Sequence, residues 1–329
     1  MQSSDPGSAP RCHTRLEPQR HDEQHPELEH WRANVGVPVA IDNDITAAPR
    51  IDGIDVLSWN VAIGTGRLDT VLDRLRAGAG GGAGMSPERP LIVLLQEAYR
   101  ADASVPGSTG TQHHGGRLRI ASGRVDIVGV AREHNLSLRY SPSMRNGLHS
   151  SDRGNAILST VRLDDARAFL LPYVRQRRVV VSARIAGHAD LSFVSAHLDT
   201  HGQPRSRGGA PRFGAGRAAQ AEALAAALSD VGGSFVLGAD LNTVFGMSDP
   251  AVRALVAAGL HPARRVGNWR HTFHRPFKLL LDHVLYASHD RRIAHVEVTR
   301  IDEAPGDRSP AVFGSDHHPL LARIELNHH

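Results

Sequence analysis

The chain has 329 residues, 40% of them hydrophobic, which is enough for one large α/β domain or two ordinary ones. The formal net charge is only +4 and nearly all of the positive charge is arginine, so the composition permits an anionic substrate without requiring one. A single cysteine, Cys12, excludes an internal disulfide framework, and the lack of a long apolar run excludes stable membrane insertion. Because the N-terminus also lacks the apolar core of a secretory signal, we expect a soluble, cytoplasmic protein.

The sequence divides into two regions of different composition. Residues 1–50 are polar and rich in His, Pro, Glu and Gln, which predicts a disordered or loosely packed N-terminal arm. Apolar runs begin at Ile51, and residues 51–329 are predicted to form one layered α/β catalytic domain. Strands are predicted at residues 54–60, 91–95, 155–159, 177–185, 191–197, 234–242, 279–286, 296–300 and 320–326, and helices at residues 68–75, 218–228 and 250–260.

The stretch 234–242 combines a buried strand with polar residues at its end. Phe235 opens a short apolar run, and the small residues Gly238 and Ala239 allow the backbone to approach another element closely. Asp240 and Asn242 are two residues apart, so they point to the same side of an extended backbone. Taken alone, the pattern is equally consistent with a strand that ends in an Asp/Asn turn.

Similar polar residues recur at the ends of other apolar runs. They are Asn60, Glu97, His197, Asp240, Asn242, Asp282, Asp316 and His317. So many charged groups at buried strand ends are difficult to explain by structure alone, because an unpaired buried charge is costly. Carboxylates with an amide suit a hard cation, Mg²⁺ or Mn²⁺, and not zinc. Histidines beside them suit a second anionic species such as a phosphate.

Six short motifs, in this order, carry a family resemblance. They are Ser58-Trp-Asn60, Leu95-Gln-Glu97, Ser195-Ala-His-Leu198, Gly238-Ala-Asp-Leu-Asn242, Thr272-Phe273 with Leu281-Asp-His283, and Ser315-Asp-His-His-Pro319. Between about residues 54 and 326 the chain resembles the endonuclease/exonuclease/phosphatase superfamily. The resemblance implies a four-layer α/β/β/α sandwich with two facing mixed β-sheets and a site at one rim. It also implies hydrolysis of phosphoesters that depends on a divalent metal ion.

The resemblance also implies a role for each matching residue. Glu97 would hold the Mg²⁺ or Mn²⁺ ion, with Asn60 nearby and Asp316 as a further ligand. Asp240 would activate the attacking water, and Asn242 would fix Asp240 or a phosphate oxygen. The two histidines His197 and His317 would bind phosphoryl oxygens, one of them serving as general acid or base, and Asp282 would hold the His317 ring. Abasic-site nucleases of the family have a carboxylate two residues after the first Asn, where this chain has Ala62, and this weakens a two-metal interpretation.

Two further residues are candidates for substrate binding. Arg175 lies at the position where deoxyribonuclease-type members place an arginine against the substrate, although an exposed basic strand face would give the same pattern. Asn155 could line the pocket or could belong to a turn.

The preferred function is a nuclease-like phosphodiesterase that acts as a monomer on a phosphoester substrate, which could be a nucleic acid. Arginines at residues 162–184 and 203–217 permit such a substrate. A small-molecule or lipid phosphoesterase, similar to sphingomyelinases or inositol-phosphate phosphatases, is the alternative. A non-catalytic binding protein of the same fold would be expected to lack a central acid or histidine, and none is missing.

Overall fold

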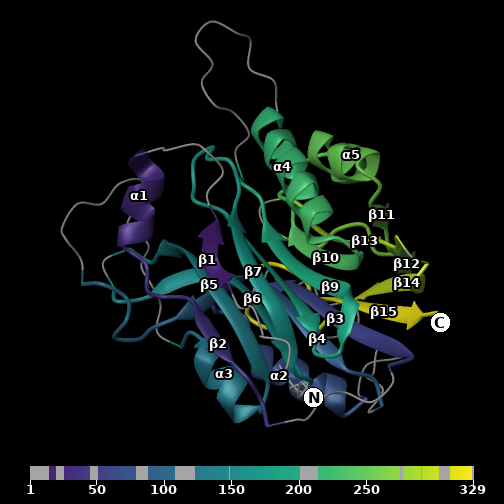
Figure 1. Ribbon diagram of the computed structural model, residues 1–329, viewed down its shortest axis with the longest axis horizontal. Coiled ribbons are helices and arrows are strands. Elements are labelled where there is room, and N and C mark those ends of the chain that lie inside the picture. Colours follow the sequence, from purple (N-terminus) through teal and green to yellow (C-terminus); the bar gives the residue numbers. More distant parts are fainter. Residues whose placement is uncertain are drawn as a thin grey trace, which may run out of the picture.

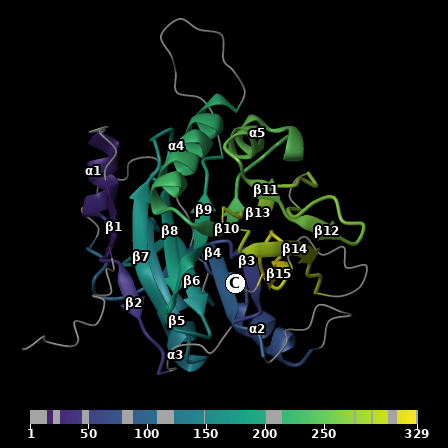
Figure 2. The same ribbon diagram turned by 45° about the vertical axis from the view of Figure 1, so that its right-hand side comes forward.

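The structure is a computed structural model, and it describes residues 15–19, 26–44, 51–78, 88–107, 123–147, 149–200, 214–274, 277–289, 291–303 and 312–327. Within these residues two mixed β-sheets face each other (Figure 1). In Figure 2 helices α4 (Ala215–Val231) and α5 (Pro250–Ala257) lie at the top, and α2 (Leu68–Arg76) and α3 (Ile127–Glu133) lie at the bottom. The strands run between these two pairs of helices.

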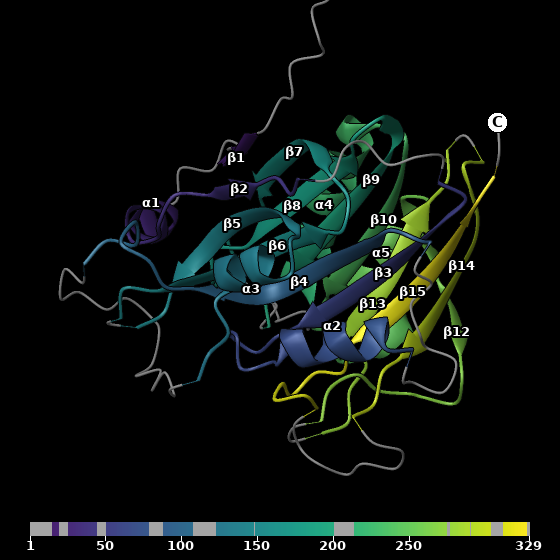
Figure 3. The same ribbon diagram turned by 90° about the horizontal axis from the view of Figure 1, so that it is seen from below.

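The strand order defines the two sheets. In the described residues one sheet has seven strands in the order β1 (Arg15–Gln19), β7 (Leu163–Leu170), β8 (Val179–Ile185), β9 (His188–His197), β10 (Ser234–Asp240), β13 (Asp282–Ala287) and β11 (His261–Pro262). The other has eight, in the order β12 (Arg264–Val266), β14 (Ile293–Arg300), β15 (Leu320–Leu326), β3 (Gly53–Asn60), β4 (Leu91–Arg100), β6 (Asp152–Ser159), β5 (Ser137–Arg145) and β2 (Val39–Ile41). Figure 3 shows both sheets from below.

Side-chain alternation along the strands separates three cores. Val56 of β3 and Val236 of β10 belong to the core between the sheets. The next residue on each strand faces the other way: Leu57 packs with α2 and α3, and Leu237 packs with α4 and α5. The predicted four-layer α/β/β/α sandwich is therefore confirmed. No helix in the described part of the chain is long and apolar enough to cross a bilayer.

Aspartate side chains cap the N-termini of α3 and α5. The Asp126 side chain accepts hydrogen bonds from two backbone amides at the start of α3, which otherwise have no partner within the helix. Asp249 does the same for the Ala251 amide at the start of α5 and also pairs with Arg217 of α4 at 3.1 Å. The pair of buried charges ties α4 to the loop that follows β10, with its short 3₁₀ helix Gly246–Ser248.

The prediction of a loosely packed arm over residues 1–50 is wrong for three described segments. β1 pairs in parallel with β7, and β2 pairs antiparallel with β5, so each extends the edge of one sheet. Between them lies α1 (Pro26–Ala33), which buries Leu28 and Trp31. Leu16 enters the core between the sheets. Each segment is too short to show a hydrophobic period, and its partners lie far away in the sequence, so composition alone did not reveal it.

Candidate active site

Four of the expected residues end strands at one rim of the sandwich. Asp240 at the end of β10 is in register with His197 of β9 and with Asp282 of β13. The side chain of each lies on the strand face that points between the sheets. On β10, for example, Asp240 shares this face with Val236, four residues earlier. Asn60 ends β3 in the opposite sheet and reaches Asp240 directly. Alternation therefore directs all four side chains to one place.

Close contact between the sheets holds this rim in position. An added Cβ atom at Gly238 would lie 2.6 Å from Ser58 Oγ and 2.8 Å from a Leu94 methyl carbon, so only glycine fits there. The Gln96 side chain donates to the Gly238 carbonyl and to Ser195 Oγ, both at 3.2 Å. These buried polar contacts fix the ends of β4, β9 and β10 relative to one another.

Asp240 lies at the centre of the hydrogen-bond network. Its Oδ2 accepts from Asn60 Nδ2 at 2.8 Å, and its Oδ1 accepts from the Asn242 backbone amide at 2.9 Å. His197 Nε2 and His317 Nε2 lie 3.4 Å and 3.9 Å from the same Oδ2. Burial raises the pKa of Asp240 to about 7, against the opposing effects of His317 and the hydrogen bonds. The carboxyl group can therefore take up and release a proton near neutral pH.

His317 is held as a cation. Its Nδ1 lies 2.8 Å from Asp282 Oδ2, while Trp59 Nε1 donates to its backbone carbonyl at 2.9 Å. Phe273 packs against its ring with the centroids 4.9 Å apart. Burial alone would lower its pKa, but the charges of Asp282 and Asp240 outweigh burial and raise the pKa to about 10. The imidazolium form therefore prevails at neutral pH.

His197, in contrast to His317, is neutral. Burial, reinforced by Arg178 and His317, lowers its pKa well below the ordinary value, so the ring is neutral at pH 7. The two hydrogens of Asn242 Nδ2 reach His197 Nε2 and the Leu198 carbonyl, both at 3.0 Å. Because Nε2 accepts this bond, the ring proton belongs on Nδ1. Two histidines with divergent pKa values are typical of an acid–base site.

Glu97 is directed by an irregularity of its strand. The pairing of β4 with β6 shifts register between Leu95 and Ala98, and Glu97 has a φ of 55°. A left-handed backbone is costly for a residue with a side chain, and such bulges re-aim side chains next to active sites. Its half-buried carboxylate forms no hydrogen bond or ion pair with any residue that the structure describes.

Two of the three predicted metal ligands, Glu97 and Asp316, offer carboxylate oxygens that suit a hard cation. The Glu97 carboxylate is free of described partners, and the Asp316 carboxylate is half-exposed, 3.9 Å from His317 Nε2. The oxygen Asp282 Oδ1 is buried without a hydrogen bond. Carboxylate oxygens of this kind are the ligands that Mg²⁺ and Mn²⁺ prefer.

Asn60, a metal ligand according to the resemblance, contacts Asp240 directly. Its Nδ2 donates to Asp240, and its Oδ1 accepts from the Ala62 amide at 2.9 Å. Both ends of the amide are therefore engaged in positioning Asp240. Among the described residues, two groups of three side chains lie close enough to share an ion. One group is Asp240, Asp282 and His317, and the other is His271, His274 and His318. Neither group contains Glu97 or Asp316.

Of the arginines near β8, Arg178 is buried beside the site, whereas Arg175 is exposed. The Arg175 side chain is exposed, and its backbone amide donates to Asp199 in a turn at 2.9 Å. Arg178 is only 3% exposed, and its charge acts on Glu97 and Asp240. Its guanidinium forms no hydrogen bond or ion pair within the described chain. Sequence reasoning missed this residue, since its neighbour Arg177, bound to the Pro142 carbonyl at 2.6 Å, looks the same in the sequence.

Asn155 links the two sheets. Its Nδ2 donates to the carbonyls of Val179 at 2.8 Å and Ser195 at 3.2 Å, and the residue is 2% exposed. Both amide hydrogens are used in this way, which leaves only the side-chain oxygen for any contact with a substrate.

Solved structures share this fold. An endonuclease/exonuclease/phosphatase from Bacteroides vulgatus superposes with a TM-score of 0.55 at 13% identity, covering 84% of this chain and 99% of that one. The human Nocturnin catalytic domain with a bound sulfate anion gives 0.53 at 13% identity, covering 88% and 98%. The 3′ phosphatase NExo from Neisseria, bound to a product DNA hairpin, gives 0.50 at 17% identity, covering 84% and 100%.

Sequence comparison identifies the family. A search of curated proteins gives no match. The sequence pattern of the Endonuclease/Exonuclease/phosphatase family matches residues 57–317, which include the whole rim from Asn60 to His317. This chain belongs to the endonuclease/exonuclease/phosphatase family.

Proposed function

We propose that the protein is a divalent-metal-dependent phosphodiesterase of the nuclease type. One observation carries the proposal: a carboxyl group with a pKa of about 7, an imidazolium and a buried arginine without a described partner meet at one rim. These groups are Asp240, His317 and Arg178. The DNA hairpin in the NExo structure and the sulfate in the Nocturnin structure support a phosphate-like ligand.

Each group matches a need of phosphodiester hydrolysis. The reaction requires an in-line water, neutralised phosphoryl oxygens and a protonated leaving group. Asp240, oriented by Asn60 and Asn242, takes the proton from the water, because a base is most effective with a pKa near the working pH. His317, held by Asp282, donates a proton to the leaving oxygen.

The remaining groups neutralise and orient the phosphoryl oxygens. A Mg²⁺ or Mn²⁺ ion held by Glu97 and Asp316 would supply positive charge there when bound. Arg178 presents guanidinium hydrogens, which suit two phosphate oxygens at once. Neutral His197 is kept in place by Asn242 and carries its proton on Nδ1.

A second candidate function, hydrolysis of a lipid phosphodiester, is favoured by exposed apolar side chains near the rim. Phe245 and Met247, 58% and 37% exposed, follow Asn242, and Phe277, 70% exposed, precedes β13. Thr243 joins the two loops, since its hydroxyl donates to the Leu280 carbonyl at 2.6 Å. An apolar lip of this kind suits either a bilayer surface or the face of a nucleobase.

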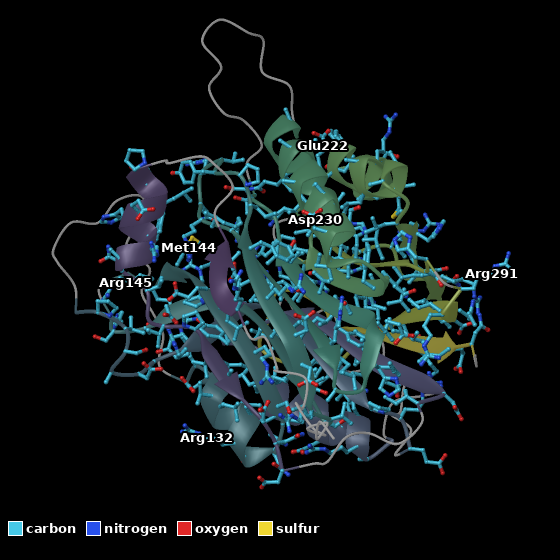
Figure 4. The ribbon with its side chains drawn as sticks, viewed as in Figure 1. Arg132, Met144, Arg145, Glu222, Asp230 and Arg291 are labelled. Atoms are coloured by element: carbon cyan, nitrogen blue, oxygen red, sulfur yellow. The ribbon has the colours of Figure 1, made fainter. Side chains whose placement is uncertain are left out.

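A substrate panel tests both candidates. Purified protein with Mg²⁺ or Mn²⁺ is assayed on bis(p-nitrophenyl) phosphate, plasmid DNA, RNA and sphingomyelin vesicles. Asp240→Asn is expected to lower kcat/KM by about 10²- to 10⁴-fold. The control Asp230→Asn alters an exposed carboxylate on α4 and should leave the rate unchanged (Figure 4). Hydrolysis of sphingomyelin alone would favour the second candidate, and no hydrolysis of any substrate would overturn both.

A further inference from the structure

Three histidines converge beside the rim but outside the catalytic network. His271 and His274 lie in the loop between β12 and β13, and His318 precedes β15. One ring nitrogen from each lies within 4.8 Å of the other two. The ring centroids are 5.1 Å apart for His271 and His274, 5.7 Å for His271 and His318, and 4.4 Å for His274 and His318. Imidazoles gathered in this way present their lone pairs to a common point.

The surrounding backbone brings the rings together. The His318 amide donates to the Thr272 carbonyl at 2.7 Å, and the His274 amide donates to the Asp316 carbonyl at 3.2 Å. The Nε2 atoms of His274 and His318 are in direct contact. A cation between two such nitrogens would take up both lone pairs when neither nitrogen carries a proton.

A carboxylate behind the cluster orients one of the rings. His318 Nδ1 lies 2.9 Å from Asp302 Oδ1 and 3.3 Å from the Ile301 carbonyl, and two acceptor oxygens on this side favour the ring proton on Nδ1, with Nε2 left as a ligand. A carboxylate behind a metal-binding histidine is a recurrent arrangement that fixes the ring and makes it more basic. Arg300 also pairs with Asp302, at 2.9 Å, so the carboxylate is held from a second side.

The charges around the cluster favour neutral rings. Arg300 Nη1 lies 3.2 Å from His271 Nε2, and Lys278 acts on both loop histidines. Neutral imidazoles bind transition metals, whereas an anion would require the protonated form.

We propose that His271, His274 and His318 bind a Zn²⁺ ion, separate from the carboxylate site of the catalytic centre. Imidazole nitrogen suits zinc, and three histidines leave one tetrahedral position for water. The ion ties the loop at His271–His274 to the loop at Ser315–His318. Phe273 packs on the ring of His317, so the ion stabilises the wall of the catalytic centre from outside. The proposal concerns metal binding and is independent of the proposed phosphodiesterase activity.

Zinc content measured by mass spectrometry tests the site. The full chain is stripped with a chelator, incubated with Zn²⁺ and desalted, and one zinc per chain is expected. His271→Ala and His274→Ala should each lose this zinc. His149→Ala, at an exposed histidine, and Glu97→Gln, at the proposed Mg²⁺ ligand, should both retain it. A wild-type chain without zinc, or His271→Ala and His274→Ala chains that bind it fully, would overturn the proposal.

Two further measurements protect the test against variants that fail to fold. Asp302→Asn keeps all three histidines and is expected to weaken zinc binding by about 10- to 100-fold. Titration of the unaltered chain with Co²⁺ should give the intense visible absorption of a tetrahedral site with nitrogen ligands. The weak spectrum of six-coordinate Co²⁺ would contradict the proposal without any variant.

Discussion

Replacing Arg178 with methionine should lower activity and raise stability at the same time. The residue is 3% exposed, its Nε atom is buried without a hydrogen bond, and burial lowers its pKa. A buried polar group without a partner costs about 1–3 kcal/mol, so Arg178→Met should raise the free energy of unfolding by about that amount. Methionine fills most of the same volume without a charge.

The expected loss of activity follows from the hydrogen bonds that Arg178 would make to the phosphate. Hydrogen bonds to charged groups contribute about 1.5–3 kcal/mol, which corresponds to a kcat/KM about 10- to 150-fold lower. Arg178→Lys keeps the charge but loses the planar pair of donors, so it should recover only part of the rate. The measurements are urea unfolding and hydrolysis of bis(p-nitrophenyl) phosphate.

Substitutions of two other arginines serve as comparisons in this experiment. Arg132→Met, on the exposed surface of α3, serves as the control and should change stability by less than about 0.5 kcal/mol (Figure 4). Arg175→Met tests the assignment that the sequence alone suggested. If Arg175→Met lowers kcat/KM as strongly as Arg178→Met, or if Arg178→Met destabilises the protein, the structural reasoning about Arg178 is refuted.

Three other substitutions probe the metal site, a buried histidine and a buried ion pair. Glu97→Gln should raise the Mg²⁺ concentration needed for half-maximal activity at least about tenfold, as a metal titration would show; an unchanged requirement would remove Glu97 from the site. Burial lowers the pKa of His283 to about 4, so its contribution to stability is complete above pH 6.5 and falls by about 3 kcal/mol as the pH drops to 4. Urea unfolding across this range should therefore show a weaker acid loss for His283→Gln, and equal losses would contradict the assignment. Asp152→Ala should cost about 3–5 kcal/mol in urea unfolding, because it removes the buried carboxylate that bonds the fully buried Arg100 and leaves only the more exposed Asp102 at 3.5 Å; a cost below about 1 kcal/mol would argue against this pair.

The sequence could predict which strand-end side chains face the site, because side chains alternate between the two faces of a strand. Asn60, His197 and Asp240 end apolar strands and Asp282 begins one, and a period of two directs all four to the same face as the core residues of their strands. Apolar runs in order likewise indicated one layered α/β domain, and the family resemblance implied its four layers. These features depend on neighbours in the chain, and they are visible without the fold.

The features that the sequence could not predict depend on distant contacts. Glu97 is aimed by a register shift against β6, and nothing in Leu95-Gln-Glu97 announces a left-handed backbone. Arg178 and Arg175 look alike in the sequence, but the fold buries the first and exposes the second. Asn155 meets the carbonyls of two strands in the opposite sheet, which no local pattern encodes.

The short strands β1 and β2 have a consequence for association between molecules. They cover β7 in one sheet and β5 in the other, and both belong to the first 41 residues. A chain shortened to begin at residue 51 would present the unpaired backbone groups of β7 and β5 to solvent, and such edges are templates for strands of other molecules. The N-terminal segment therefore shields one edge of each sheet, with the five residues of β1 and the three residues of β2.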